Sequence, residues 1–164
     1  MFPGFRSVPV PKAVPSPLVL ILDQDEETRN AMRGLLHAAG YRTLLAASLF
    51  EATEIARGHS GLQLLVLNSL MTSGAPATQA LGALRELAGD HLKAVLILDS
   101  LWSLPSHLRS DPLTRVRRGP VSPDALVAAL EELRPLSRET RLVSSTSAGP
   151  QDAHNRRQRP LAVT

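Results

Sequence analysis

The sequence predicts an α/β domain built on a five-stranded parallel sheet with helices on both faces. Five short runs of apolar or β-branched residues alternate with segments of helical periodicity, which is the pattern of repeated strand–helix–strand units. The first of these runs, LVLIL at 18–22, is continuously apolar rather than alternating. Continuous apolar runs are typical of strands covered on both faces, so a doubly wound sheet is expected.

The first half of the domain contains two predicted strands and two predicted helices. Asp25 is placed to cap a helix that runs as far as Gly40, a glycine in the usual position just past a helix end. A weaker strand is predicted at 41–47. A helix at 48–57 opens on a Ser-x-x-Glu capping box, which satisfies backbone donors at both ends of the motif, and Gly58 ends it.

The second half continues the same alternation. It holds a strand at 62–67, a helix at 77–88, a strand at 93–98, a short strand at 114–118, and a helix that opens on Ser122 and Pro123 and ends at Pro135. Pro105 and Pro112 interrupt the segment before the fifth strand, so the fourth helix is expected to be short or irregular. The whole pattern favours a flavodoxin-like topology with strand order 2-1-3-4-5.

The charge is distributed unevenly along the 164 residues. Residues 1–136 hold 13 basic and 13 acidic side chains, so the net charge of +3 comes from residues 137–164. We interpret 18–136 as the folded domain, 1–17 as a disordered proline-rich leader, and 137–164 as a solvated, disordered basic tail. The alternative is that RRQR at 156–159 tethers the protein to nucleic acid, which usually calls for a basic folded face as well.

Several function classes lack support in the sequence. The chain has no cysteine, so disulfides, thiolate metal sites and cysteine catalysis are excluded. No stretch approaches the roughly 18 apolar residues of a membrane span, and the N-terminus lacks the apolar core of a signal peptide, so a cytoplasmic location is expected. The five histidines are scattered, and neither a glycine-rich phosphate loop nor a hydrolase triad is found. An enzyme is therefore not expected.

Four stretches in this order and spacing carry a family resemblance: VLILDQDEETRNAMRGLLHAAGY, LQLLVLNSLM, AVLILDS and GPVSPDALVAALEEL. Over about residues 18–134 the chain resembles the receiver domain of bacterial two-component response regulators. The resemblance implies phosphoryl transfer from a histidine kinase to an aspartate after the third strand. It also implies a magnesium ion held by an acidic pair, a hydroxyl after the fourth strand and a lysine after the fifth. The metal and the lysine would offset the charge of the transferred group.

Most of these positions hold the wrong residue for that chemistry. The acidic pair is represented by Asp23 and Gln24, the acceptor by Asn68, the hydroxyl by Asp99 or, with a shift of one residue, by Ser100, and the lysine by Gly119. An amide offers no oxygen of useful nucleophilic strength, so phosphotransfer is expected to be lost. The chain is accordingly interpreted as a degenerate pseudo-receiver. The resemblance also predicts a cis bond between Gly119 and Pro120.

Two interpretations of the pocket stay open. Asn68 either mimics one state of a switch or only satisfies local backbone at a strand end. Asp23, Asp99 and the Asn68 carbonyl oxygen could bind Mg²⁺ weakly, but the set is thin. We therefore expect no cofactor, with the two acids solvated or one of them held by Arg118. A rewired phosphoacceptor at Asp23 or Asp99 is the remaining enzyme-like alternative.

The predicted function is that of a stand-alone regulatory module that binds a protein without phosphorylation. Receivers commonly use the surface of the fourth helix, fifth strand and fifth helix, where this chain carries Trp102, Arg115, Arg117 and Arg118. An arginine-rich surface with an aromatic residue suits an acidic partner, whereas an ordinary edge strand protected by charge is the alternative. The expected partner is a histidine kinase, another signalling protein or a second copy, with no membrane, nucleic acid or small-molecule substrate.

Overall fold

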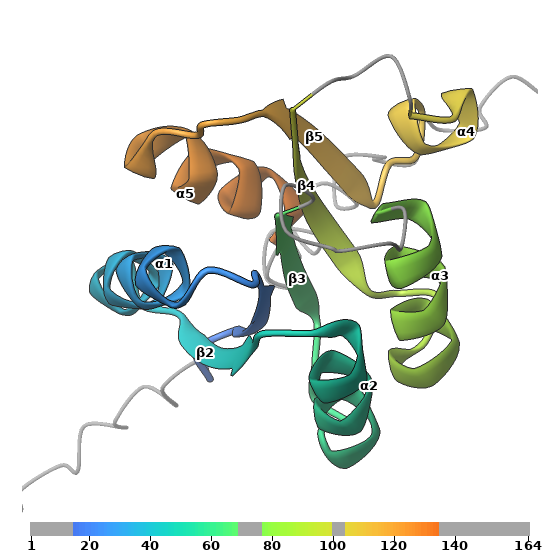
Figure 1. The fold of residues 1–164 in the computed structure, drawn as a ribbon, viewed down its shortest axis with the longest axis horizontal. Coiled ribbons are helices and arrows are strands. Elements are labelled where there is room, and N and C mark those ends of the chain that lie inside the picture. Colours follow the sequence, from blue (N-terminus) through green and yellow to red (C-terminus); the bar gives the residue numbers. More distant parts are fainter. Residues whose placement is uncertain (1–14, 69–76, 100–103, 135–164) are drawn as a thin grey trace, which may run out of the picture. The chain divides into compact units, whose positions relative to one another are not determined.

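The sheet has the predicted five parallel strands in the predicted order. A computed structural model describes residues 15–68, 77–99 and 104–134. The strands are β1 (Leu18–Leu22), β2 (Arg42–Ala46), β3 (Leu64–Asn68), β4 (Lys93–Leu98) and β5 (Thr114–Arg118). They follow the order β2-β1-β3-β4-β5, so β2 and β5 are the edge strands (Figure 1).

The helices lie where their capping residues and periodicity predict them. They are α1 (Glu26–Ala38), α2 (Leu49–Gly58), α3 (Ala77–Ala88), α4 (Ser106–Arg109) and α5 (Pro123–Leu133). The helix in the proline-interrupted segment, α4, is a single short turn, as expected. Strand β2 is shorter than the predicted 41–47 by one residue at each end, and α2 is shifted by one residue from the predicted 48–57. Strand β3 begins at Leu64 instead of 62 and includes Asn68 as its last residue.

The local end signals act as predicted. The Asp25 carboxylate accepts a hydrogen bond of 2.7 Å from the Thr28 N–H at the start of α1. The Ser48 and Ser122 side chains cap α2 and α5 in the same way. Gly40, just past the end of α1, has a φ of 88°, a conformation that glycine adopts without the penalty of a Cβ atom. These caps fix where α1, α2 and α5 begin relative to the strand ends.

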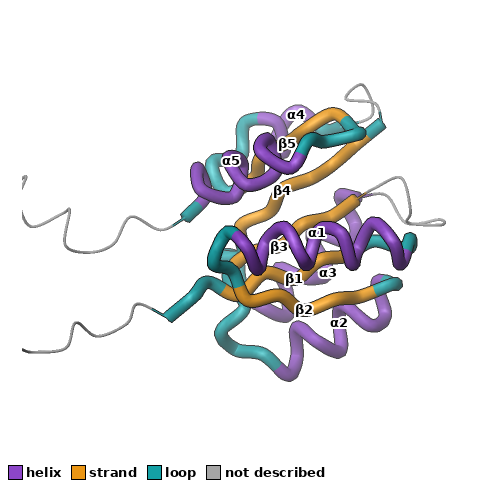
Figure 2. The backbone as a smooth tube through the Cα atoms, turned by 90° about the vertical axis from the view of Figure 1, so that its left-hand side faces the viewer, coloured by secondary structure: helices purple, strands orange, loops and turns teal. Residues whose placement is uncertain are grey.

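Two apolar layers hold the helices against the sheet. Helices α1 and α5 cover one face and α2 and α3 the other, with α4 beside β5 (Figure 1); α1 and α5 lie in front of the strands in Figure 2. Alternate strand residues serve the two layers: Ile21 and Val66 pack on the α1 and α5 side, and Leu20 and Leu65 on the other. Each such fully buried side chain contributes about 1.5–3 kcal/mol.

The proposed leader and tail lie almost wholly outside the described residues. Pro17, assigned to the leader, is buried, and its carbonyl oxygen accepts a 3.0 Å hydrogen bond from the Arg42 N–H. The folded part therefore begins with this residue instead of with Leu18. No helix in the described part of the chain has the length and apolarity needed to cross a bilayer.

Candidate functional site

Asp23 and Asn68 lie side by side at the carboxyl edge of the sheet. Strands β1 and β3 pair in parallel, with Leu22 opposite Leu67, so the residues that follow these two positions are neighbours. Both side chains are buried, Asp23 with 1% and Asn68 with 7% of its surface exposed. This edge is where ligands bind in open α/β sheets. The structure therefore brings together two of the predicted pocket residues.

Neutral donors surround the Asp23 carboxylate. Its Oδ2 atom accepts a 2.8 Å hydrogen bond from the Asn68 amide Nδ2, and its Oδ1 atom accepts a 2.9 Å bond from the Asp25 N–H. The Arg29 guanidinium donates to the backbone carbonyl of Asp23 instead of to its carboxylate. The expectation that Asp23 is solvated or held by Arg118 is therefore wrong, because a buried strand-end carboxylate needs partners close by.

The other predicted pocket positions are less enclosed. The Gln24 side chain is exposed, and its backbone carbonyl accepts a hydrogen bond from Arg29. Asp99 follows β4 and is exposed, as expected for a solvated acid. The Gly119 N–H donates to the Leu98 carbonyl at 2.8 Å, and the bond from Gly119 to Pro120 is cis, as predicted. Ser100 and Trp102 lie outside the described residues.

The donor set at this edge does not fit the magnesium ion that the fold resemblance implies. Both oxygens of Asp23 already accept hydrogen bonds from the protein, and the second acidic position holds a glutamine. Within the described ranges, no three histidine or acidic side chains come together in a way that could hold a metal ion. Magnesium needs carboxylate oxygens that are free to coordinate it.

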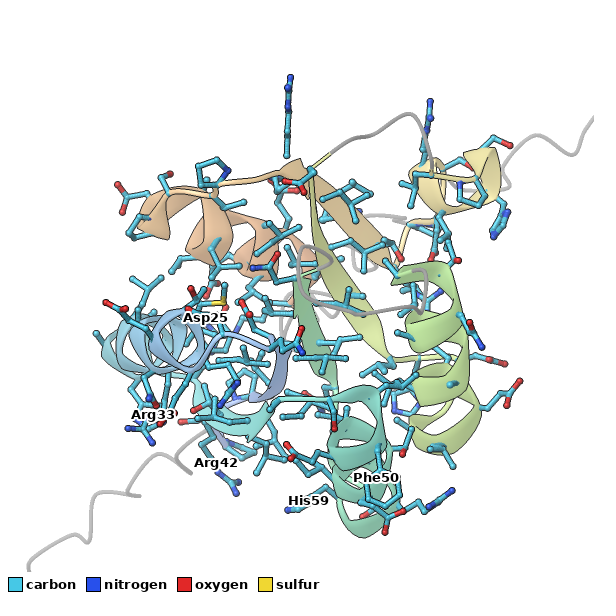
Figure 3. The ribbon with its side chains drawn as sticks, in the orientation of Figure 1. Asp25, Arg33, Arg42, Phe50 and His59 are labelled. Carbon is cyan, nitrogen blue, oxygen red and sulfur yellow. The ribbon has the colours of Figure 1, made fainter. Side chains whose placement is uncertain are left out.

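A cleft of about 480 Å³ opens beside Asn68, between α1 and the start of α5. Met32, Leu35, Ile97 and Leu126 are among the apolar residues that line it. Asp25, on the side of α1 that faces α5 (Figure 3), contributes a carboxylate. Hydrogen bonds from the Thr28 side chain and backbone lower the pKa of Asp25, so the group is ionised near neutral pH.

The candidate partner surface on β5 has a feature that the sequence did not reveal. Glu132, on α5, pairs with two arginines of β5: its Oε2 lies 2.8 Å from the Arg115 Nε, and its Oε1 lies 3.1 Å from an Arg117 terminal nitrogen. Arg118, the third predicted arginine, is exposed. A cavity of about 420 Å³ lies beside β5 and is lined in part by Arg109, Arg115 and Arg117.

A second ion pair joins α3 to the start of β5. The Arg85 guanidinium lies 2.8 Å from the Asp111 carboxylate and also donates to the Thr114 hydroxyl. Burial would raise the pKa of Asp111, but hydrogen bonds from Thr114 and Leu113, together with the Arg85 charge, lower it overall. The sequence alone does not indicate Arg85, Asp111 and Glu132 as paired residues, since no local spacing relates residues of different elements.

Many solved structures share this fold. No protein-family model matches the chain, and no curated protein sequence is significantly similar to it. A response regulator receiver protein from Sinorhizobium medicae WSM419 aligns over 72% of this chain and 94% of its own, with 18% identity and a TM-score of 0.61.

Two further structures give the same result. The receiver domain of the hybrid histidine kinase CckA covers 71% of this chain and 99% of its own, with 20% identity and a TM-score of 0.59. The chemotaxis protein CheY4 of Vibrio cholerae covers 73% of this chain and 99% of its own, with 16% identity and a TM-score of 0.58. At these identities the likeness establishes the flavodoxin-like, receiver-type fold. Function has to be argued from the site.

Proposed function

We propose that this chain is a receiver-like regulatory module of two-component signal transduction that works through protein contacts and transfers no phosphoryl group. The fold supports the signalling class, since the similar solved structures include receiver domains and a chemotaxis protein. The observation that carries the loss of phosphotransfer is the 2.8 Å hydrogen bond from the Asn68 amide to Asp23. It places an amide donor where phosphotransfer needs a nucleophilic carboxylate.

The rest of the pocket agrees with this proposal. Gly119, the residue that follows β5, has no cationic side chain, so nothing at that position would neutralise a transferred phosphoryl group. Asp99 adds a negative charge at the same edge of the sheet. Asp23 is a poor alternative acceptor, because it is buried and both of its oxygens accept hydrogen bonds. The module is therefore proposed to be non-enzymatic, with its output delivered by a partner protein.

The test is exposure of the whole chain to acetyl phosphate and Mg²⁺, followed by intact mass measurement and a Phos-tag gel. We expect no phosphorylated species, while an active receiver domain in the same buffer is modified. Asp99→Asn and Asp23→Asn are prepared in parallel. A hydroxylamine-sensitive phosphate on the wild type that disappears in one of these variants would contradict the proposal and identify a rewired acceptor.

Binding to nucleic acid through the basic tail is the alternative and has its own test. Affinity for duplex DNA would fall steeply with salt and vanish when residues 137–164 are removed. Within the described residues the arginines of β5 are partly neutralised by Glu132, which favours a protein partner for that surface.

A further inference from the structure

Arginine side chains of β5 cover two backbone acceptors on the outer edge of the strand, the carbonyls of Thr114 and Val116. Strand β5 is the last strand of the sheet. Ala94 donates to the Leu113 carbonyl and Gly119 donates to the Leu98 carbonyl, so odd-numbered residues direct their backbone groups toward β4. Successive residues of a strand point these groups to opposite sides. The backbone groups of Thr114, Val116 and Arg118 therefore face away from the sheet, at an edge that could pair with another chain.

Two arginines donate hydrogen bonds to backbone carbonyl groups that face outward. One terminal nitrogen of Arg115 donates to the carbonyls of Pro112 and Thr114, both at 3.1 Å. A terminal nitrogen of Arg117 donates to the Val116 carbonyl at 3.1 Å. Glu132 holds both guanidinium groups from α5. We call Arg115, Arg117 and Glu132 the β5 arginine cluster. It engages the outward carbonyls of Thr114 and Val116, while no described residue covers the outward N–H groups of Val116 and Arg118.

The cluster is exposed enough to be rearranged. The side chains of Arg115 and Arg117 are each 31% exposed, and that of Glu132 is 49% exposed. Exposed ion pairs contribute little to stability, because water and salt compete with them. An incoming carboxylate can therefore replace Glu132 at little cost, and the guanidinium groups can turn away from the edge carbonyls. Among the described residues no strand pairs with this edge.

We propose that the outer edge of β5 binds an extended, acidic segment of a partner protein, which adds to the sheet as a sixth strand. Backbone groups of the segment pair with the outward groups of Val116 and Arg118 and with the Thr114 carbonyl, as in other cases of strand addition. The Thr114 N–H is not used, because it donates to the Asp111 carbonyl. Carboxylates of the segment replace Glu132 as the ion-pair partners of Arg115 and Arg117.

Charge identifies the occupant. Both edges of this sheet carry arginine, at Arg42 on β2 and at three positions of β5, so a second copy would bring like charges together. Opposite charges across neighbouring strands are favourable and like charges are not. This inference rests on the proposed function in one respect, that the protein acts through contact with a partner protein. Its experiment uses no phosphoryl donor, so strand addition and the loss of phosphotransfer can each be disproved without the other.

The experiment uses the full chain and a labelled, end-blocked peptide of alternating Thr and Glu, with a Thr–Lys peptide as the charge control. Fluorescence anisotropy gives the affinity, and amide hydrogen exchange locates the contact. We expect binding of the acidic peptide only, weakened by salt, with slower exchange at Val116 and Arg118. The amides of Arg115 and Arg117 already donate toward β4, so their exchange is the internal reference.

Two matched pairs of variants separate the parts of the inference. Glu132→Gln frees the arginines and is expected to tighten peptide binding roughly fivefold, the equivalent of one exposed ion pair. Glu54→Gln removes the same charge from the exposed pair with Arg57 on α2 and is expected to change nothing. Arg118→Pro removes an outward N–H and is expected to abolish binding, whereas Arg118→Gln removes only the charge and weakens it.

Three outcomes would overturn the proposal. The first is an acidic peptide that binds neither the wild type nor the Glu132→Gln variant. The second is binding without slower exchange at Val116 and Arg118, which would place the contact elsewhere. The third is self-association of the Glu132→Gln variant with protection of the same two amides in the absence of peptide, which would make a second copy the occupant.

Discussion

Asp23 and Glu132 are both carboxylates held by two donor groups, but their surroundings are opposite. Asp23 is 1% exposed and is held by a backbone N–H and the Asn68 amide. Glu132 has a side chain that is 49% exposed and is held by the cations of Arg115 and Arg117. The first carboxylate lies at the carboxyl edge of the sheet, and the second lies on α5, beside the last strand of the sheet.

This difference separates a fixed site from an exchangeable one. Removing a donor from the buried Asp23 leaves a charged oxygen without a partner, and no water can replace the lost bond cheaply. Removing a donor from Glu132 returns a carboxylate to water, where it is well solvated. The pocket at the strand ends is thus built to stay as it is, whereas the β5 edge can change its partners. We expect the regulatory contact at the second region.

The largest effect is expected from Asn68→Asp, which puts a second carboxylate beside Asp23. Two unit charges about 4 Å apart repel by about 4 kcal/mol at an effective dielectric constant near 20. Protonation relieves part of this, so a loss of about 3 kcal/mol near neutral pH is predicted from urea unfolding. One carboxyl of the pair then has a raised pKa in the folded state, so the free energy of unfolding of the variant falls as pH rises. The difference from wild type therefore shrinks as pH is lowered toward about pH 5.

Asn68→Leu is the matched control for this variant. It removes the 2.8 Å hydrogen bond to Asp23 without adding a charge, and a loss of about 1–2 kcal/mol is expected. If Asn68→Asp lowers the free energy of unfolding no more than Asn68→Leu does, and the loss does not shrink in acid, the side chains at positions 23 and 68 are not in contact. Recovery of the Asn68→Asp variant by Mg²⁺ would show that the amide alone keeps the metal out.

An intermediate effect is expected from Asp111→Asn, which breaks the half-buried pair with Arg85. The two side chains are 16% and 18% exposed, so a loss of about 2 kcal/mol is predicted, below that of a fully buried pair. The pKa of Asp111 is lowered in the folded state from an ordinary 3.8. The ionised Asp111 carboxylate therefore stabilises the folded state in full above pH 3.8. This stabilisation is lost as pH falls through the lowered pKa of the folded state. Urea unfolding against pH should show the difference from wild type shrinking only in strong acid.

The fold could be predicted from the sequence because its signals are local. Continuous apolar runs identify covered strands, and the caps at Asp25, Ser48 and Ser122 identify helix starts within a residue or two. The position of Asn68 at the end of β3 was predicted in the same way. Its bond to Asp23 was not, because it joins side chains 45 residues apart in the sequence and depends on how strands β1 and β3 are aligned.

Glu131 and Glu132 show the same limit at the other region. The two glutamates are adjacent in α5, yet Glu131 accepts a hydrogen bond from the buried Tyr41 hydroxyl and Glu132 pairs with Arg115 and Arg117. Neighbouring helical residues point about 100° apart, so the rotation of α5 against the sheet decides which of the two meets β5. Periodicity predicts the apolar face of this helix but not which glutamate reaches the edge strand.

The smallest effect is expected from Glu132→Gln, which leaves the fold nearly unchanged. Each exposed ion pair contributes about 0–1 kcal/mol, and the amide can still accept from one arginine. A loss of less than about 0.5 kcal/mol in urea unfolding is predicted, like that of Glu54→Gln, whose partner Arg57 is also exposed. A loss comparable to that of Asp111→Asn would mean that the β5 arginine cluster is needed to hold α5 on the sheet. Glu132 would then hold its arginine partners as firmly as Asp23 holds Asn68, and the β5 edge would not be an exchangeable site.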